Sequence, residues 1–184
     1  RYQFPAMVTD AQATRASFAG VTGGLKLPTG RTTVANGDGE VAERTLQPGS
    51  GTTDALLGAY YREALGNLNP SWFVQANLQL PLNSYHAYKP GNQVLIDVGG
   101  RWDATDKLGL MLQLNAHYKG RDSGDEAEPD DSGSRTLSIS PGFTYAVTPT
   151  VQVYAFVQLP VYQRVNGVQL VADRSYAVGV SAQF

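Results

Sequence analysis

The chain has 184 residues, no cysteine and a formal net charge of −2, and its mean hydropathy is −0.24. This length suits one domain, and the near-neutral charge gives no basic surface of the kind that binds nucleic acid. The lack of cysteine excludes disulfides, thiolate catalysis and cysteine-ligated metals. No apolar run approaches the roughly 20 residues of a membrane-spanning helix, but a transmembrane β-barrel distributes its apolar residues in alternation, so a membrane location stays open.

Alternation of apolar and polar residues predicts a series of β-strands separated by gaps of two lengths. The predicted strands are residues 18–27, 54–65, 71–83, 94–103, 108–119, 135–147, 151–163 and 175–184, with a further alternating piece at 2–8. Short gaps at about 66–70, 104–107 and 148–150 alternate with long ones at about 29–53, 84–92, 121–133 and 164–173. Outer-membrane barrels have this alternation, with short periplasmic turns and long extracellular loops.

The last predicted strand has one apolar face that continues to the final residue. Its members are Tyr176, Val178, Val180, Ala182 and Phe184. A terminal aromatic residue normally frays into water, whereas lipid would surround it. The pattern resembles the C-terminal signal by which bacterial outer-membrane barrels are recognised for insertion.

Strand 108–119 shows the two faces most clearly. Its even-numbered positions, from Leu108 to Tyr118, are mostly leucine, and its odd positions include Gln113, Asn115 and His117. Strand 135–147 likewise has large apolar residues at odd positions and small polar ones at even positions. We expect the apolar rows to face lipid and the polar rows to face the lumen.

Aromatic residues are expected to form two interfacial girdles. At the ends assigned to the periplasm lie Trp72, Trp102, Tyr145 and Phe184, and at the opposite ends lie Tyr118 and Tyr176. Segments 70–81 and 149–160 resemble each other and both end in Gln-Leu-Pro. Because proline removes a ladder donor, Pro28, Pro81 and Pro160 are predicted to mark bulges or the ends of pairing.

The predicted fold is an all-β, antiparallel, up-and-down transmembrane β-barrel in a single domain over residues 1–184. Eight or nine strands are visible in the chain. Bacterial barrels generally have an even number of strands with both ends in the periplasm, so we expect at least one N-terminal strand to be missing and the complete barrel to have about ten or twelve. No signal peptide is visible before Arg1, which suits a processed or truncated product.

Three stretches, 24–30, 46–54 and 161–170, resemble a known family. They read Gly-Leu-Lys-Leu-Pro-Thr-Gly, Leu-Gln-Pro-Gly-Ser-Gly-Thr-Thr-Asp and Val-Tyr-Gln-Arg-Val-Asn-Gly-Val-Gln-Leu. They are similar to bacterial outer-membrane barrels of the MetA-pathway of phenol degradation family, whose members are mostly named as candidate transporters. The resemblance implies the barrel fold and an outer-membrane location, and it brings no catalytic motif.

The inward rows supply the candidate lumen-lining residues, namely Lys26, Arg62, Gln75, Asp97, Arg101, Asn115, His117 and Lys119. Hairpin pairing about the turn at 104–107 places Asp97 across from Asn115 and diagonal to His117, and Arg101 across from Met111. These residues suit a weakly cation-biased constriction or, alternatively, a lining that only keeps the pore hydrated. Aromatic residues predicted on the inward rows are Phe18, Tyr60, Phe73, Tyr154, Phe156 and Tyr162.

The acidic loop 122–131 offers oxygen ligands but lacks the spacing of an EF-hand, so solvated loop charge is the preferred interpretation over a cation site. Catalysis has little support, because the histidines are His86 in a loop and His117 in the wall. No catalytic, metal-binding or cofactor-binding residue is therefore assigned, and no cofactor is expected.

The predicted function is a porin-like outer-membrane channel for passive transport of a small solute. The alternatives are a scaffold barrel that assembles with envelope partners, a barrel enzyme and a soluble ligand-binding barrel. The expected partners are the lipid bilayer with its lipopolysaccharide and the barrel assembly machinery. Solute identity, oligomeric state and closure of the pore by loop 29–53 stay open.

Overall fold

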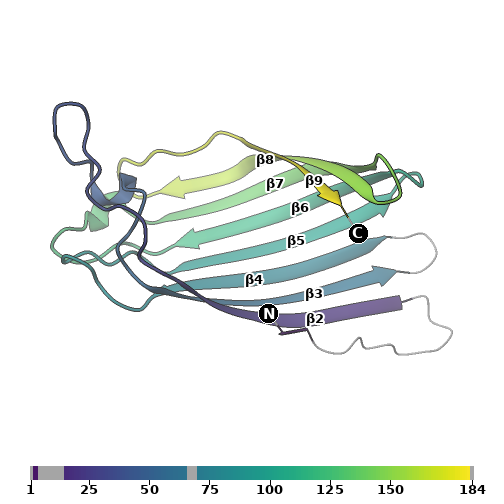
Figure 1. Ribbon diagram of the computed structural model, residues 1–184, viewed down its shortest axis with the longest axis horizontal. Helices are drawn as coiled ribbons and strands as arrows, with labels where there is room; N and C mark the ends of the chain where they lie inside the picture. Colours follow the sequence, from purple (N-terminus) through teal and green to yellow (C-terminus); the bar gives the residue numbers. More distant parts are fainter. Residues whose placement is uncertain (1, 4–14, 66–69, 183–184) are drawn as a thin grey trace.

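The computed structural model describes residues 2–3, 15–65 and 70–182. These residues form an antiparallel nine-stranded sheet in which every strand pairs with its neighbours along the chain (Figure 1). The strands are β1 (Tyr2–Gln3), β2 (Arg15–Lys26), β3 (Asp54–Leu65), β4 (Ser71–Pro81), β5 (Gln93–Asp103), β6 (Leu108–Lys119), β7 (Ser134–Ala146), β8 (Val151–Val165) and β9 (Ser175–Ala182). Two short 3₁₀ helices, η1 (Arg44–Leu46) and η3 (Pro129–Asp131), lie in the loops.

The predicted strands are confirmed, and β3 and β6 have the predicted bounds. The other strands differ by up to three residues at an end, with β2 beginning at Arg15 and β4 ending at Pro81. The rest of the predicted piece at 2–8 and the terminal Phe184 lie outside the described residues. The up-and-down meander is confirmed, whereas a closed barrel is not, because β1 and β9 are the two edges of an open sheet.

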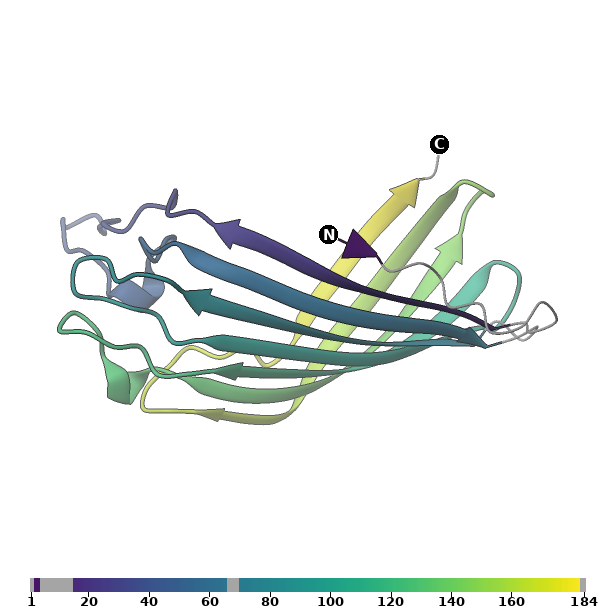
Figure 2. The same ribbon diagram turned by 90° about the horizontal axis from the view of Figure 1, so that it is seen from below.

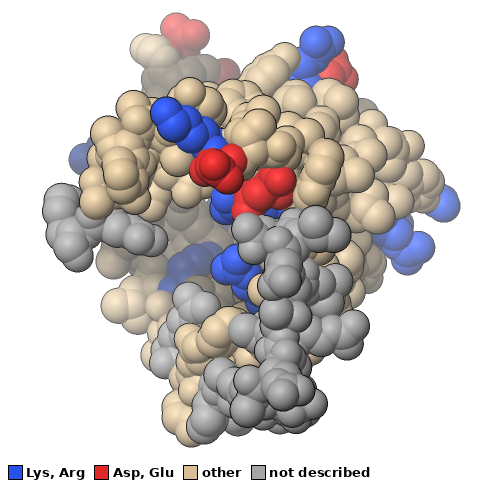
Figure 3. Space-filling model, turned by 90° about the vertical axis from the view of Figure 1, so that its right-hand side faces the viewer, with Lys and Arg blue, Asp and Glu red and all other residues tan. Residues whose placement is uncertain are grey.

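The sheet is curled into a trough. Its two edges, near β1 and β9, rise on the same side (Figure 2). The short turns 104–107 and 147–150 lie at one end of the trough, called here the turn end, and the long connections lie at the other, called the loop end (Figure 1). Seen from the turn end, Lys and Arg side chains lie within the hollow (Figure 3). The connection 27–53 extends beyond the strand ends in both ribbon views, rather than back over the trough.

In contrast to a water-soluble domain, in which large apolar side chains are mostly buried, most of those described here are exposed. Among the described residues, the one buried large hydrophobic side chain is that of Tyr88, which is 3% exposed. The convex rows are open to the surroundings, with Trp102 56% and Val178 81% exposed. Contiguous apolar surface on this scale marks a face that contacts lipid or another protein. No helix in the described part of the chain is long and apolar enough to cross a membrane.

Tyr162 was predicted to face the lumen, and the structure shows that this is wrong. The register between β7 and β8 shifts at Leu137 and Ser138, so that Tyr162 pairs with Leu137 while Pro160 pairs with Ser138. One extra residue on β8 reverses the faces beyond it, and Tyr162 therefore joins the convex row of Leu137. The bulge lies beside Pro160, as predicted, and Pro81 ends β4, also as predicted.

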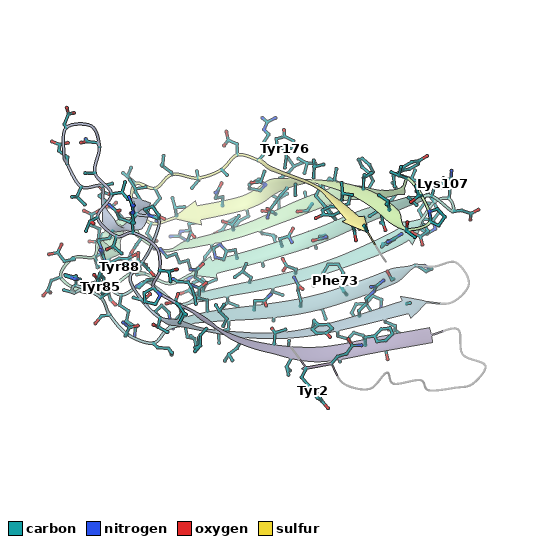
Figure 4. The ribbon with its side chains drawn as sticks, in the orientation of Figure 1. Tyr2, Phe73, Tyr85, Tyr88, Lys107 and Tyr176 are labelled. Carbon is teal, nitrogen blue, oxygen red and sulfur yellow. The ribbon has the colours of Figure 1, made fainter. Side chains whose placement is uncertain are left out.

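Tyr176 also departs from the predicted girdle. It is the second residue of β9 and pairs with Val157, which lies in the middle of β8 (Figure 4). Tyr176 is thus on the convex row, as predicted, but halfway along the wall rather than at the loop end. Trp72, Trp102 and Tyr145 do lie near the turn end, and Tyr118 lies near the loop end.

Candidate functional site

Four polar side chains form a hydrogen-bonded row across the concave side of β4 to β7. Register places Asp97 between Gln75 and Asn115. Gln75 Nε2 donates to Asp97 Oδ2 over 2.9 Å, and Asn115 Nδ2 donates to Asp97 Oδ1 over 2.7 Å. Ser140 Oγ then donates to Asn115 Oδ1 over 2.5 Å. This concave polar ladder (Gln75, Asp97, Asn115 and Ser140) ties each strand to the next by side chains as well as backbone.

A cavity of about 680 Å³ lies beside the ladder, toward the turn end. Its lining comes from β1 to β6, which places it inside the trough, and it includes Arg62, Phe73 and Arg101. Arg101 Nε donates to Asp103 Oδ1 over 2.8 Å. Within residues 15–65 and 70–182, by contrast, the Arg62 guanidinium has neither an ion pair nor a hydrogen bond. A cavity of this size accommodates a small organic molecule.

Four of the concave aromatic rings each lie over a glycine on the adjacent strand. Direct cross-strand partners are Tyr60 with Gly20, Phe73 with Gly99, Phe156 with Gly142 and Tyr154 with Gly179. A Cβ atom added at any of these glycines would overlap the ring opposite. The missing side chain therefore provides the space in which the ring lies against the wall, instead of projecting into the hollow. Figure 4 shows Phe73 on β4 in this part of the sheet.

At the loop end, Lys26 belongs to a compact polar cluster around Asp54. Lys26 Nζ donates to Asp54 Oδ2 over 2.6 Å, and Gln79 Nε2 donates to the same oxygen over 2.5 Å. Thr52 Oγ1 donates to Asp54 Oδ1 over 2.7 Å. Asp54 and Thr52 are completely buried. Lys26 is one of the predicted lumen-lining residues, and its ammonium group is bound by this buried carboxylate at the loop end.

Lys119 forms a second loop-end cluster, which we name the Asp122 cluster (Tyr88, Gly91, Lys119, Asp122 and Ser132). Lys119 Nζ lies 3.0 Å from Asp122 Oδ1, and Tyr88 Oη donates to Asp122 Oδ2 over 2.8 Å. The Gly91 N–H donates to Asp122 Oδ1, and the Asp122 N–H donates to Ser132 Oγ. Burial, reinforced by the hydrogen bond to the Asp122 carboxylate, raises the pKa of the Tyr88 phenol well above its usual range.

The solvated interpretation of the acidic loop is therefore wrong for Asp122, whose exposed fraction is 1%. Asp130, in the same loop, forms an exposed ion pair with Arg121 over 2.7 Å. Asp131 Oδ1 accepts a hydrogen bond from the Val168 N–H. Over the described stretches of the chain, no group of three or more His, Asp or Glu side chains is placed to hold a metal ion.

Arg44 links two loops, a role that the sequence did not reveal. Its guanidinium lies 5.5 Å from the ring centre of Tyr85 and 5.2 Å from that of Tyr88. It also donates to the carbonyl oxygens of Ser50 and Tyr85. Figure 4 shows the two tyrosines side by side at the loop end. Cation–π contacts thus attach η1 to the β4–β5 connection, and from there to the Asp122 cluster.

Asp97 and His117, which the predicted hairpin places diagonally across from each other, each bond to other residues. His117 Nε2 lies 3.2 Å from Gln93 Oε1, and the Asp97 carboxylate accepts from Gln75 and Asn115. The predicted register around this pair is confirmed, since Asp97 pairs with Asn115 and Arg101 pairs with Met111. His117 is thus part of the concave hydrogen-bonded lining.

The structure sorts the eight predicted lumen-lining residues into three groups. Gln75, Asp97 and Asn115 belong to the concave polar ladder, with His117 one step toward the loop end. Arg62 and Arg101 line the cavity. Lys26 and Lys119 are held by buried carboxylates at the loop end. Residues missed by sequence reasoning are mainly Arg44, Tyr88 and Asp122, which only long-range contacts bring together.

Comparison with known proteins identifies a matching family. The model of a family described as "Putative MetA-pathway of phenol degradation" matches residues 12–170. No curated protein and no solved structure matches the chain.

Proposed function

The chain belongs to the family described as putative MetA-pathway of phenol degradation, and from that premise we propose that it forms an outer-membrane β-barrel through which a small solute diffuses passively. The observation that carries the proposal is the contrast between the two faces of one sheet. The convex face is apolar and exposed, while the concave face holds the polar ladder and a cavity of about 680 Å³. Lipid against the convex face would cover its apolar side chains, and water against the concave face would hydrate its polar ones.

Contacts near the turn end support a membrane interface there. The indole N–H of Trp72 donates to Glu63 over 3.1 Å, and the Trp72 ring lies 5.2 Å from that of Tyr61. An apolar ring with its polar edge bound to a carboxylate suits the level of the lipid headgroups. In liposomes, lipids carrying quenchers at headgroup depth should quench Trp72 and Trp102, and the absence of quenching would contradict the proposed outward face.

The proposed mechanism is diffusion along the concave face, which needs no cofactor and no catalytic group. Within the described chain, Asp97 is a carboxylate without a basic partner and Arg62 is a guanidinium without an acidic one. These two charges have opposite signs and favour ions of opposite charge, so we expect weak ion selectivity. Asp97→Asn should move the reversal potential toward anion preference and Arg62→Gln toward cation preference, by similar amounts. Unchanged potentials in both variants would contradict a passage along this face.

The sharpest test uses two neighbouring glycines on β5. A side chain at Gly99 would meet the Phe73 ring, since its Cβ would lie 2.5 Å from a ring atom. A Cβ at Gly100, on the opposite face, would approach only the Ser71 carbonyl, at 3.7 Å. We expect Gly99→Leu to displace the ring into the hollow and to lower single-channel conductance severalfold, and Gly100→Leu to leave it near the wild-type value.

The scaffold barrel is the outcome that would replace this proposal. The connections at the loop end are joined to one another by the Asp122 cluster and by Arg44, an arrangement that also suits a closed end. Planar-bilayer recordings on the correctly folded protein distinguish the two functions. A silent barrel that nevertheless shows tryptophan quenching by lipid would refute transport and favour the scaffold.

A further inference from the structure

A second pocket, of about 350 Å³, lies at the loop end of β6, β7 and β8. Tyr118, Arg121, Arg135, Arg164 and Asn166 are among its lining residues. It is distinct from the concave cavity, because Tyr118 and Arg135 belong to the convex rows of their strands. We name it the basic rim pocket. Three guanidinium groups in one small pocket call for an explanation, since like charges repel.

Strand register brings two of these arginines directly together. Arg135 pairs with Arg164 across β7 and β8, and on its other side it pairs with Tyr118 of β6. The Arg135 guanidinium lies 5.5 Å from the centre of the Tyr118 ring. Like charges directly opposite each other in a sheet are destabilising. In the described residues no carboxylate bonds to Arg135 or Arg164, so no acidic side chain there neutralises this pair of like charges.

The third arginine is only weakly neutralised. Arg121 pairs with Asp130, whose side chain is 95% exposed. Exposed ion pairs contribute little and exchange readily. Arg121 is therefore available to a stronger anion, whereas Lys119, which also lines the pocket, is held by the buried Asp122.

We propose that the basic rim pocket binds the phosphate group of an outer-leaflet lipid, with Arg135 and Arg164 as its main ligands. The inference rests on the proposed function, because only in an outer-membrane barrel does this face meet lipid headgroups. Arginine binds phosphate through paired, charge-assisted hydrogen bonds, and a bound phosphate converts the opposed guanidiniums into two ligands of one anion.

The surroundings of the pocket favour a lipid over a free anion. Directly next to Arg135 and Arg164 on the convex face lie Leu137 and Tyr162, which are paired with each other and exposed. Val168, in the adjoining β8–β9 connection, is 90% exposed. A free phosphate ion has no apolar part that could contact these side chains, whereas the acyl chains of a phospholipid or lipid A would cover them.

The test measures binding of diphosphorylated lipid A to the full chain in detergent micelles, with EDTA present so that no divalent cation bridges the two. The variant is R135Q/R164Q, and the matched control is Arg31→Gln, a basic residue in another loop-end connection. We expect the double variant to bind lipid A at least about tenfold more weakly. The loss of a single hydrogen bond to a charged group already lowers affinity by about tenfold. The control should bind as the wild type does.

Two further probes identify the source of the phosphate. Lipid A stripped of its phosphates should bind the wild-type protein and the double variant equally weakly. Inorganic phosphate at the same concentration should not compete with lipid A. Competition by inorganic phosphate would overturn the lipid assignment, and undiminished lipid A binding by the double variant would overturn the site.

A folding defect is not expected to obscure the result. Because the variant removes a like-charge pair, it should unfold at the same or slightly higher urea concentration than the wild type when no lipid A is present. Its conductance and tryptophan quenching should also equal those of the wild type. If the rim pocket does not bind lipid A, conductance and quenching are unaffected in both proteins. If the proposed transport fails, both proteins are silent in planar bilayers, and if the proposed membrane location fails, both lose tryptophan quenching.

Discussion

The turn end and the loop end of the sheet are held together by different kinds of interaction. At the turn end, Thr105 Oγ1 accepts hydrogen bonds from the N–H groups of Lys107 and Leu108, and Thr148 does the same for Thr150 and Val151. These bonds join residues at most three apart. At the loop end, the key bonds join residues far apart in sequence, such as Tyr88 with Asp122. The turns are thus local structures, while the loop connections depend on one another.

This difference predicts that single substitutions at the loop end destabilise the protein far more than those at the turns. Asp122→Ala should have the largest effect, because it leaves the Tyr88 hydroxyl, the Gly91 N–H and the Lys119 ammonium without their acceptor. We expect a loss of about 3–5 kcal/mol in the free energy of unfolding, measured by urea titration in liposomes with tryptophan fluorescence. Asp125→Ala, an exposed acid in the same loop, should change it by less than about 0.5 kcal/mol. Equal effects would contradict the buried cluster.

Arg44 tests whether the loops are joined to one another. Arg44→Lys keeps the charge but loses the planar group that lies against Tyr85 and Tyr88. We therefore expect the contact to stabilise the loops by about 1–2 kcal/mol less than in the wild type. The consequence should be local, with faster hydrogen exchange and proteolysis between residues 27 and 53. Arg31→Lys serves as the control in the same connection. Unchanged protection in Arg44→Lys would show that η1 is held by other contacts.

The raised pKa of Tyr88 predicts a smaller, pH-dependent effect. A group whose pKa is raised on folding stabilises the protein below its unfolded pKa, here about 10, and loses that contribution as pH rises through the folded value. From pH 10 to pH 11 the wild type should lose about 1 kcal/mol more than Tyr88→Phe does. Urea midpoints at pH 8, 10 and 11 measure the difference. Parallel curves for both proteins would mean that the phenol titrates normally.

The smallest effect is expected at the turns. Thr105→Ala removes an acceptor for two exposed N–H groups that water can serve instead, so the cost should be at most about 1 kcal/mol. Thr148→Ala should behave alike, since its bonds have the same pattern. A loss comparable with that of Asp122→Ala, in the same urea titration, would remove the distinction between the two ends.

The same distinction explains how far the sequence could be interpreted. Strand positions and faces follow from alternation, which is local, and Asp97 and Asn115 were correctly paired because a four-residue turn fixes their hairpin. Tyr162 was assigned to the wrong face because the bulge beside Pro160 adds one residue to β8. Strict alternation assumes that no such residue is present. The two loop-end clusters were missed since no local pattern links Lys26 to Asp54 or Tyr88 to Asp122.

The ring-over-glycine pairs have a consequence for how such a protein diversifies. In each pair the residue that sets the free width of the hollow is the glycine, which lies on a different strand from the ring. A single change from glycine to alanine, without touching any aromatic or charged residue, would tilt the ring opposite inward. Relatives with the same polar lining and the same wall can therefore differ in the free width of the hollow through changes at these glycines alone.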